Sequence, residues 1–263
     1  MKKQTIRAIQ KSKGVEKLSM ITAYDSLFAK LFNGNVDLIL VGDSLNMSFG
    51  GKKDTLSISM DMMIYHTNAV CQGATETFIV CDMPFGTYMN RDEALQNATR
   101  VYQETDADSV KIEGGIEKAD TVKYLVDNGI AVMGHIGLMP QSSRSEGGYF
   151  VKGRDSDSRE RVLQDAKAIE KAGAFAIVVE GVTEEVAKEI TEAVHIPVIG
   201  IGAGKYVDGQ VLVWSDMLGF FEDFKPKFVK QYIKGGEIIR TAVKQYSDEV
   251  KSGLFPEEAN IYN

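Results

Sequence analysis

Four acidic residues each end or directly follow a short apolar run, and these positions indicate that their carboxylates belong to one site. They are Asp43, Asp82, Glu113 and Glu180. Short apolar runs predict buried strands, and a carboxylate beside a buried strand is costly unless something pairs with it. If these strand ends meet, the carboxylates repel one another unless a cation joins them or their pKa values rise. Oxygen ligands without nearby His or Cys pairs favour Mg²⁺.

Each of these acids also has a simpler interpretation. An acidic residue after a strand often starts a turn or caps the next helix, so only several acids together favour a site. Lys111 precedes Glu113 by two residues and so points to the same side of the strand. Lys111 either makes a structural ion pair inside the barrel or is the cation that holds a substrate carboxylate beside the metal. His135, flanked by glycines at Gly134 and Gly137, is either a core histidine or a catalytic one.

The elements that position these residues follow a regular order. Eight apolar runs predict strands, and most are separated by segments with helical apolar spacing. The runs are Leu18–Thr22, Val36–Gly42, Phe78–Cys81, Ser109–Glu113, Ala131–Gly137, Phe175–Glu180, Pro197–Gly202 and Gln210–Trp214. Eight strand and helix repeats in about 250 residues favour an α/β fold of the (β/α)₈ TIM barrel type over an open doubly wound sheet. The acids then surround one barrel mouth.

We expect one barrel domain over residues 1–263, with an N-terminal extension and C-terminal helices, because no linker composition interrupts the repeats. Two long segments, Asp43 to Asp54 and Leu138 to Asp157, follow strands and belong on the rim that carries the active site. The segment Lys227 to Lys251 predicts one or two amphipathic helices that cap the barrel or contact a neighbouring subunit. The glycines of Gly200 to Gly204 form a weak phosphate-loop pattern or relieve crowding at the rim.

Composition excludes several classes of function. The chain has 263 residues, 30 Lys and Arg against 37 Asp and Glu, and a net charge of -7 without a long basic run. Nucleic acid is therefore not an expected partner. No apolar run reaches the 18 residues of a membrane span, and the N-terminus lacks the apolar core of a signal peptide, so we expect a cytoplasmic protein without membrane contact. The cysteines Cys71 and Cys81 form no disulfide framework.

Several longer motifs occur in the segments around these residues. They are Gly42-Asp43-Ser44-Leu45, Asp82-Met83-Pro84-Phe85-Gly86-Thr87-Tyr88, Val110-Lys111-Ile112-Glu113-Gly114-Gly115, Gly134-His135-Ile136-Gly137-Leu138-Met139-Pro140-Gln141-Ser142, and Gly200-Ile201-Gly202-Ala203-Gly204 with Asp208-Gly209-Gln210. Together they resemble the ketopantoate hydroxymethyltransferase (3-methyl-2-oxobutanoate hydroxymethyltransferase) family, from about Met20 to the C-terminal region in consistent order. The resemblance implies a barrel of the phosphoenolpyruvate/pyruvate superfamily and a cytoplasmic homo-oligomer, with a decamer suggested by the family.

The resemblance also implies an activity. The enzyme would transfer a hydroxymethyl group from 5,10-methylenetetrahydrofolate to 3-methyl-2-oxobutanoate, with Mg²⁺ as cofactor, and form ketopantoate for pantothenate synthesis. The implied magnesium positions are Asp43, Asp82 and Glu113, the last through water. The implied substrate-binding positions are Asp43, Ser44, Asp82, Lys111 and His135, and Glu180 matches the catalytic proton acceptor.

Two other functions stay open at this level. The first keeps the barrel and magnesium but catalyses carbon–carbon lyase or phosphonomutase chemistry, as in the related isocitrate lyase group. Those relatives usually carry a cysteine-containing active-site loop, which this sequence does not show. The second is a metabolite-binding or scaffold protein without catalysis, which would bind the oxo-acid without exchanging its C3 proton.

Overall fold

The computed structural model describes residues 3–222 and 225–262. The chain forms two compact units, Met1–Val213 and Trp214–Asn263. The first contains the sheet and the candidate site, and the second consists of helices and turns. The interpretation of residues 1–263 as one domain stays a prediction.

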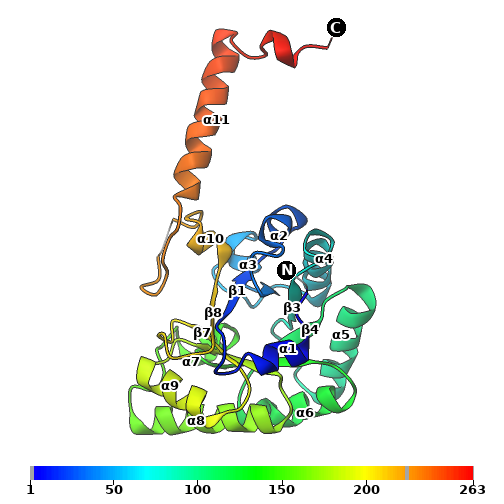
Figure 1. Ribbon diagram of the computed structural model, residues 1–263, viewed down its shortest axis with the longest axis vertical. Helices are drawn as coiled ribbons and strands as arrows, with labels where there is room; N and C mark the ends of the chain where they lie inside the picture. The colour runs from blue at the N-terminus through cyan, green and yellow to red at the C-terminus, as the bar shows by residue number, and fades with distance from the viewer. Residues whose placement is uncertain (1–2, 223–224, 263) are drawn as a thin grey trace. The chain divides into compact units, whose positions relative to one another are not determined.

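Eight parallel strands of the first unit close into a barrel in chain order, with β8 paired to β1 (Figure 1). All eight predicted runs contain a strand, with ends within two residues of those expected, and the (β/α)₈ fold is confirmed. The strands are β1 Leu18–Thr22, β2 Leu38–Val41, β3 Phe78–Asp82, β4 Ser109–Glu113, β5 Val132–Gly137, β6 Ala176–Glu180, β7 Val198–Ile201 and β8 Gly209–Leu212.

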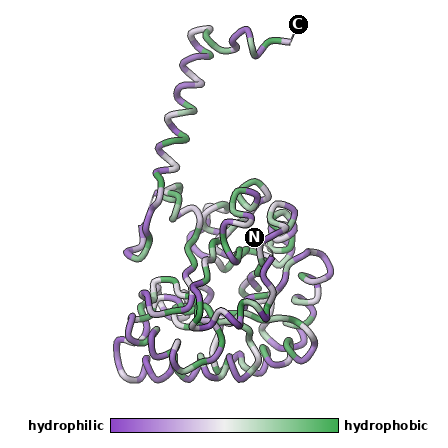
Figure 2. The backbone as a smooth tube through the Cα atoms, viewed as in Figure 1, coloured by the Kyte–Doolittle hydropathy of each residue, from purple (hydrophilic) through white to green (hydrophobic). Residues whose placement is uncertain are grey.

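Helices surround the barrel, and Figure 2 shows hydrophilic residues along many of them, with hydrophobic residues concentrated toward the strands. Several begin at a side-chain cap; Asp25, for example, accepts hydrogen bonds from the Leu27 and Phe28 N–H groups. The helices are α1 Ile6–Lys11, α2 Ser26–Phe32, α3 Leu45–Ser48, α4 Met60–Gly73, α5 Arg91–Glu104, α6 Ala119–Asp127, α7 Ser143–Glu146, α8 Ser156–Lys171 and α9 Glu184–Ala193, with short 3₁₀ turns at Ile116–Lys118 and Pro140–Ser142.

The N-terminal extension closes the amino-terminal end of the barrel. Ile9 of α1 is fully buried and packs into the same core cluster as Leu18 and Phe78 at the strand starts. Lys13 then pairs with the buried carboxylate of Asp208 at 2.8 Å, just before β8. Because this end is filled with apolar side chains, the carboxyl-terminal end is left for chemistry.

The second unit contains α10 Trp214–Met217, α11 Gly235–Ser252 and a 3₁₀ turn at Glu258–Asn260. The predicted helical segment from Lys227 begins later than expected, at Gly235. The reason is that the Tyr232 and Gly235 N–H groups donate to the Met217 and Leu218 carbonyls, and not to the carbonyls four residues earlier that a helix would use.

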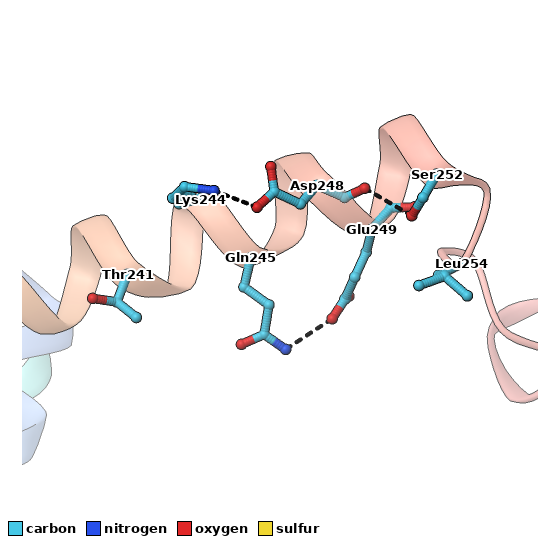
Figure 3. Close-up of a pocket in the computed structure, with 7 residues that line it drawn as sticks. All are labelled: Thr241, Lys244, Gln245, Asp248, Glu249, Ser252 and Leu254. Carbon is cyan, nitrogen blue, oxygen red and sulfur yellow. Dashed lines mark hydrogen bonds and ion pairs between the residues drawn. The ribbon is translucent and has the colours of Figure 1, made fainter.

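One side of α11 is apolar and exposed, while the other is polar. Ile239, Val243, Tyr246 and Val250 are 45–60% exposed and recur at helical spacing. The polar side carries pairs one turn apart, including Lys244 with Asp248 and Gln245 with Glu249, beside a shallow groove that also includes Thr241, Ser252 and Leu254 (Figure 3). Within the described residues, no helix has both the length and the apolarity needed to cross a membrane.

Candidate active site

Strand register brings the predicted residues to one barrel mouth. Asp82 of β3 lies opposite Lys111 of β4, and Glu113 of β4 lies opposite His135 of β5. Glu180, the last residue of β6, lies opposite Gly137. Asp82, Glu113 and Glu180 thus end their strands, and Lys111 and His135 each lie two residues before a strand end, at the side of the barrel where the active sites of barrel enzymes are found.

Lys111 is at the centre of this cluster. Its Nζ lies 2.9 Å from Asp82 Oδ1 and 3.9 Å from Glu113 Oε1, and all three side chains are buried. Among the residues that the structure describes, it is the only lysine or arginine paired with either acid. Burial alone would lower the pKa of Lys111, but the carboxylates, Asp82 foremost, raise it above its ordinary value. The lysine therefore stays charged.

His135 links the lysine to Glu180. Its Nδ1 lies 3.0 Å from Lys111 Nζ and must accept there, because an ammonium can only donate. The proton is therefore on Nε2, which lies 3.1 Å from the Leu138 carbonyl and 3.3 Å from Glu180 Oε2. Burial, followed by the charge of Lys111, lowers the pKa of His135 well below its usual value, so the ring is neutral.

Asp43 and Ser44 enter from the loop after β2. The Asp43 N–H donates to Asp82 Oδ2 at 3.2 Å, which joins the ends of β2 and β3. The Ser44 hydroxyl lies 2.8 Å from the Tyr24 hydroxyl and makes no hydrogen bond to the acids in the described structure. Ser44 therefore lies beside the cluster, next to Asp43 in the chain.

Asp43, Glu113 and Glu180 have raised pKa values. Burial, followed by the charges of Asp82 and Glu113, raises the pKa of Asp43 well above its usual value. Burial also raises the pKa of Glu113 to about 8 and that of Glu180 to about 7. The Glu180 side chain keeps 19% of its surface exposed, whereas that of Glu113 keeps 3%. Glu180 thus combines access to a bound molecule with a pKa suited to proton transfer near neutrality.

Two residues in the cluster were not predicted as functional. Gln141, in the loop after β5, donates from its backbone N–H to Glu113 Oε2 at 3.0 Å and from Nε2 to Asp43 Oδ2 at 2.9 Å. The Tyr88 hydroxyl donates to Gln141 Oε1. Both residues fall within the motifs quoted above, but a neutral side chain in a loop has no periodicity or charge pattern to mark it.

The two long segments on the rim are joined by an ion pair. Arg144 of α7 lies 2.8 Å from Asp54, and the side-chain hydrogen bond with Arg144 lowers the pKa of Asp54. Asn46 donates to the Asp54 carbonyl at 2.7 Å. Further along the second segment, the backbone of Lys152 forms an isolated parallel β-bridge with Val182, two residues after Glu180. Both segments therefore lie at the mouth as expected, and they are tied to each other.

The remaining histidines and the glycine loop have structural contacts. His66 lies 2.6 Å from the Tyr24 carbonyl, and His195 is exposed beside Glu170 near the start of β7. In the glycine loop, the Lys205 N–H donates to the Glu184 carboxylate at 3.2 Å. A Cβ at Gly204 would lie 2.5 Å from Glu184 Cγ, and one at Gly200 would lie 2.9 Å from Val207 Cγ2, so the structure favours the crowding interpretation of this loop.

Comparison with known proteins identifies the family. The model of the family described as ketopantoate hydroxymethyltransferase matches residues 3–258. The chain belongs to this family. It is 62% identical to the 3-methyl-2-oxobutanoate hydroxymethyltransferase of Nitratiruptor sp. over 99% of both chains. It is 55% identical to that of Helicobacter pylori strain P12, over 100% of this chain and 97% of the relative.

Two solved structures with similar folds share much less sequence with this chain. A phosphonopyruvate hydrolase complexed with oxalate and Mg²⁺ matches with a TM-score of 0.62 and 13% identity, covering 100% of this chain and 92% of that one. A 2,3-dimethylmalate lyase of the PEP mutase/isocitrate lyase superfamily matches with a TM-score of 0.63 and 13% identity, over 98% and 90%. At this identity the likeness shows the fold alone.

The donor atoms at the mouth of this hydroxymethyltransferase-family barrel fit Mg²⁺. Three buried carboxylates, those of Asp43, Asp82 and Glu113, lie around one lysine, and Mg²⁺ prefers oxygen ligands. Within the described residues, no group of three or more His, Cys, Asp or Glu side chains is placed so that it could hold a metal ion by itself.

We predict that Lys111→Met makes folding strongly dependent on pH. Glu113 and Glu180 already bind protons in the folded protein, between about pH 4.5 and 8, that the unfolded chain releases. Stability therefore falls as pH rises through this window. In Lys111→Met the fall is larger, because the ionised carboxylates have lost the ammonium that offsets their charge. We expect a loss of roughly 3–5 kcal/mol at pH 8 and much less at pH 5.5, measured by urea unfolding at both values.

Lys123→Met is the control, because Lys123 is an exposed partner of Asp127. It should change stability little at either pH. Equal losses at pH 5.5 and pH 8 in Lys111→Met would contradict the electrostatic assignment.

Proposed function

We propose that the chain transfers a hydroxymethyl group from 5,10-methylenetetrahydrofolate to 3-methyl-2-oxobutanoate, with Mg²⁺ as cofactor, and so forms 2-dehydropantoate in pantothenate biosynthesis. The observation that carries the proposal is the position of Glu180. Its partly open carboxylate lies beside a neutral histidine and next to the cluster of Lys111 and buried acids. Full-length similarity to hydroxymethyltransferases supports the choice of reaction.

Binding of the oxo-acid is assigned to the cation and the hydroxyl at the mouth. Lys111, held by Asp82 and His135, offers its remaining N–H to the carboxylate or keto oxygen. Ser44, held by Tyr24, offers a hydroxyl beside Asp43. We assign Asp43, Asp82 and His135 to the same binding site, because each adjoins one of these two groups.

Proton removal is assigned to Glu180. The pKa of Glu180, about 7, leaves a large part of the carboxylate ionised at neutral pH, and the raised value makes it a stronger base than an exposed glutamate. The His135 Nε2–H points toward Glu180 Oε2 at 3.3 Å and keeps the carboxylate oriented. The base takes the C3 proton, and C3 forms a bond to the one-carbon unit of the folate. Both carbon–nitrogen bonds of that unit break and water supplies the new hydroxyl oxygen. The C3 proton and one water proton end on the two folate nitrogens, and tetrahydrofolate leaves.

Three residues would hold the metal, Asp43 and Asp82 directly and Glu113 through water. When bound, Mg²⁺ supplies positive charge that acidifies the C3 proton and stabilises the enolate, a contribution of several kcal/mol. The joined rim segments, tied by Arg144 and Asp54, exclude bulk water from the site.

We also propose that the protein is a cytoplasmic homo-oligomer, as the family resemblance implies, with a decamer as the expected form. The apolar side of α11 supports assembly. A stripe of four exposed apolar residues, Ile239, Val243, Tyr246 and Val250, is the kind of surface that a second copy buries.

We predict that Glu180→Gln abolishes exchange of the C3 proton of 3-methyl-2-oxobutanoate in deuterated solvent. Loss of a general base typically costs about 10²–10⁴-fold, while oxo-acid and metal binding should change little. Proton NMR of the substrate measures exchange without folate. The exposed Glu185→Gln serves as control, and undiminished exchange in Glu180→Gln would rule out this residue as the base.

We predict that Asp43→Asn and Asp82→Asn each raise the Mg²⁺ concentration needed for half-maximal activity at least tenfold, because each removes a charged oxygen ligand. Turnover with the oxo-acid and methylenetetrahydrofolate, titrated with Mg²⁺ after chelation, measures this. The exposed Asp61→Asn should behave as wild type. Activity that persists in excess chelator would remove the metal from the mechanism.

We predict that Val243→Glu lowers the assembly state measured by light scattering, because it places a charge in the apolar stripe of α11. Thr241→Glu, on the polar side of the same helix, should leave the assembly intact (Figure 3). A wild-type protein that stays monomeric would contradict the proposal outright.

A further inference from the structure

The amide of Gln141 makes contacts on every side of its buried side chain. Its Nε2 donates to Asp43 Oδ2 and to the Met83 carbonyl, both at 2.9 Å. Its Oε1 accepts from the hydroxyl of Tyr88. Gln141 is only 5% exposed, so these contacts are shielded from water.

These partners allow one orientation of the amide. One face meets a carboxylate oxygen and a carbonyl oxygen, which can only accept, so the NH₂ group must be on that side. Turning the amide over would place Oε1 against Asp43 Oδ2 and the Met83 carbonyl oxygen, and none of these oxygens could donate a hydrogen bond. Burial and the neighbouring carboxylates, Glu113 first, raise the pKa of Tyr88 well above its usual value. The phenol therefore keeps its proton and donates to Oε1.

Tyr88 is itself held in place by Lys118. The Lys118 Nζ donates to the Tyr88 carbonyl at 3.1 Å and lies 5.1 Å from the centre of the tyrosine ring. The Tyr88 side chain is 6% exposed. A chain of contacts thus runs from the surface through Tyr88 and Gln141 to Asp43.

We propose that Gln141 is a positioning residue for the metal site, which holds Asp43 Oδ2 so that the other oxygen of Asp43 faces the cation, with Tyr88 locking the amide. The backbone N–H of Gln141 restrains Glu113 in the same way through Oε2. A single loop residue thereby orients two of the three proposed metal-binding acids. This inference deepens the proposed function and rests on its metal site.

The test is direct binding of Mn²⁺, a spectroscopic substitute for Mg²⁺, followed by electron paramagnetic resonance of the free ion without substrate. Gln141→Met keeps the side-chain length but removes both donors and the acceptor. We expect its Kd for Mn²⁺ to rise about 10–100-fold, the usual effect of losing a group that orients a metal ligand. Tyr88→Phe removes only the lock, and we expect a smaller rise of roughly 3–10-fold.

Tyr102→Phe is the matched control, since it removes a phenol at the opposite end of the strands. The Tyr102 hydroxyl donates to the Asp108 carbonyl and accepts from the Ala131 N–H. We expect it to lower thermal stability while its Mn²⁺ affinity stays within about twofold of wild type. Equal weakening of Mn²⁺ binding in this variant would assign the effect to general destabilisation and overturn the proposal.

The outcomes separate this inference from the proposed function. Wild-type affinity in folded Gln141→Met or in Tyr88→Phe would overturn the positioning role while leaving the metal site in place. A wild-type protein that binds no Mn²⁺ would overturn the metal site itself, and the positioning role with it. If Gln141→Met does not fold, Tyr88→Phe decides alone, because it deletes a single oxygen.

Discussion

The structure of the candidate site depends on one buried charge. In the described part of the chain, the Lys111 ammonium balances acids that could not otherwise share one mouth in ionised form. It does so only in part, because Asp43, Glu113 and Glu180 keep raised pKa values around it. The proposed Mg²⁺ would neutralise part of the remaining negative charge, and the raised pKa of Glu180 suits its proposed role as the base. The same raised pKa values lower the stability of the folded protein as pH rises.

The barrel makes this arrangement possible because neighbouring strands are held in fixed register. Lys111 and Asp82 face each other on paired strands, as do His135 and Glu113. The glycine opposite Glu180 is equally specific, since Gly137 has a φ of 93° and a Cβ there would lie 2.4 Å from the Glu180 carbonyl oxygen. Only glycine allows β5 to pass so close to Glu180.

Sequence reasoning located the strands and the charged residues but not the groups that orient them. Buried parallel strands read as apolar runs, so their acidic ends could be seen, and alternation placed Lys111 and Glu113 on one side. Gln141 and Tyr88 could not be assigned in this way, because their role depends on three loops meeting in space. The late start of α11 also depends on residues far apart in the chain, because the Gly235 N–H donates to the Leu218 carbonyl.

The pairing of Asp54 with Arg144 has a consequence for the passage of molecules through the mouth. Because the pair joins the segments after β2 and β5, neither segment can move away from the other without breaking this contact. The Asp54 side chain is 11% exposed but that of Arg144 is 65% exposed, so water screens the attraction. Breaking this pair therefore costs little energy, and a weak link of this kind is compatible with the entry and exit of small molecules.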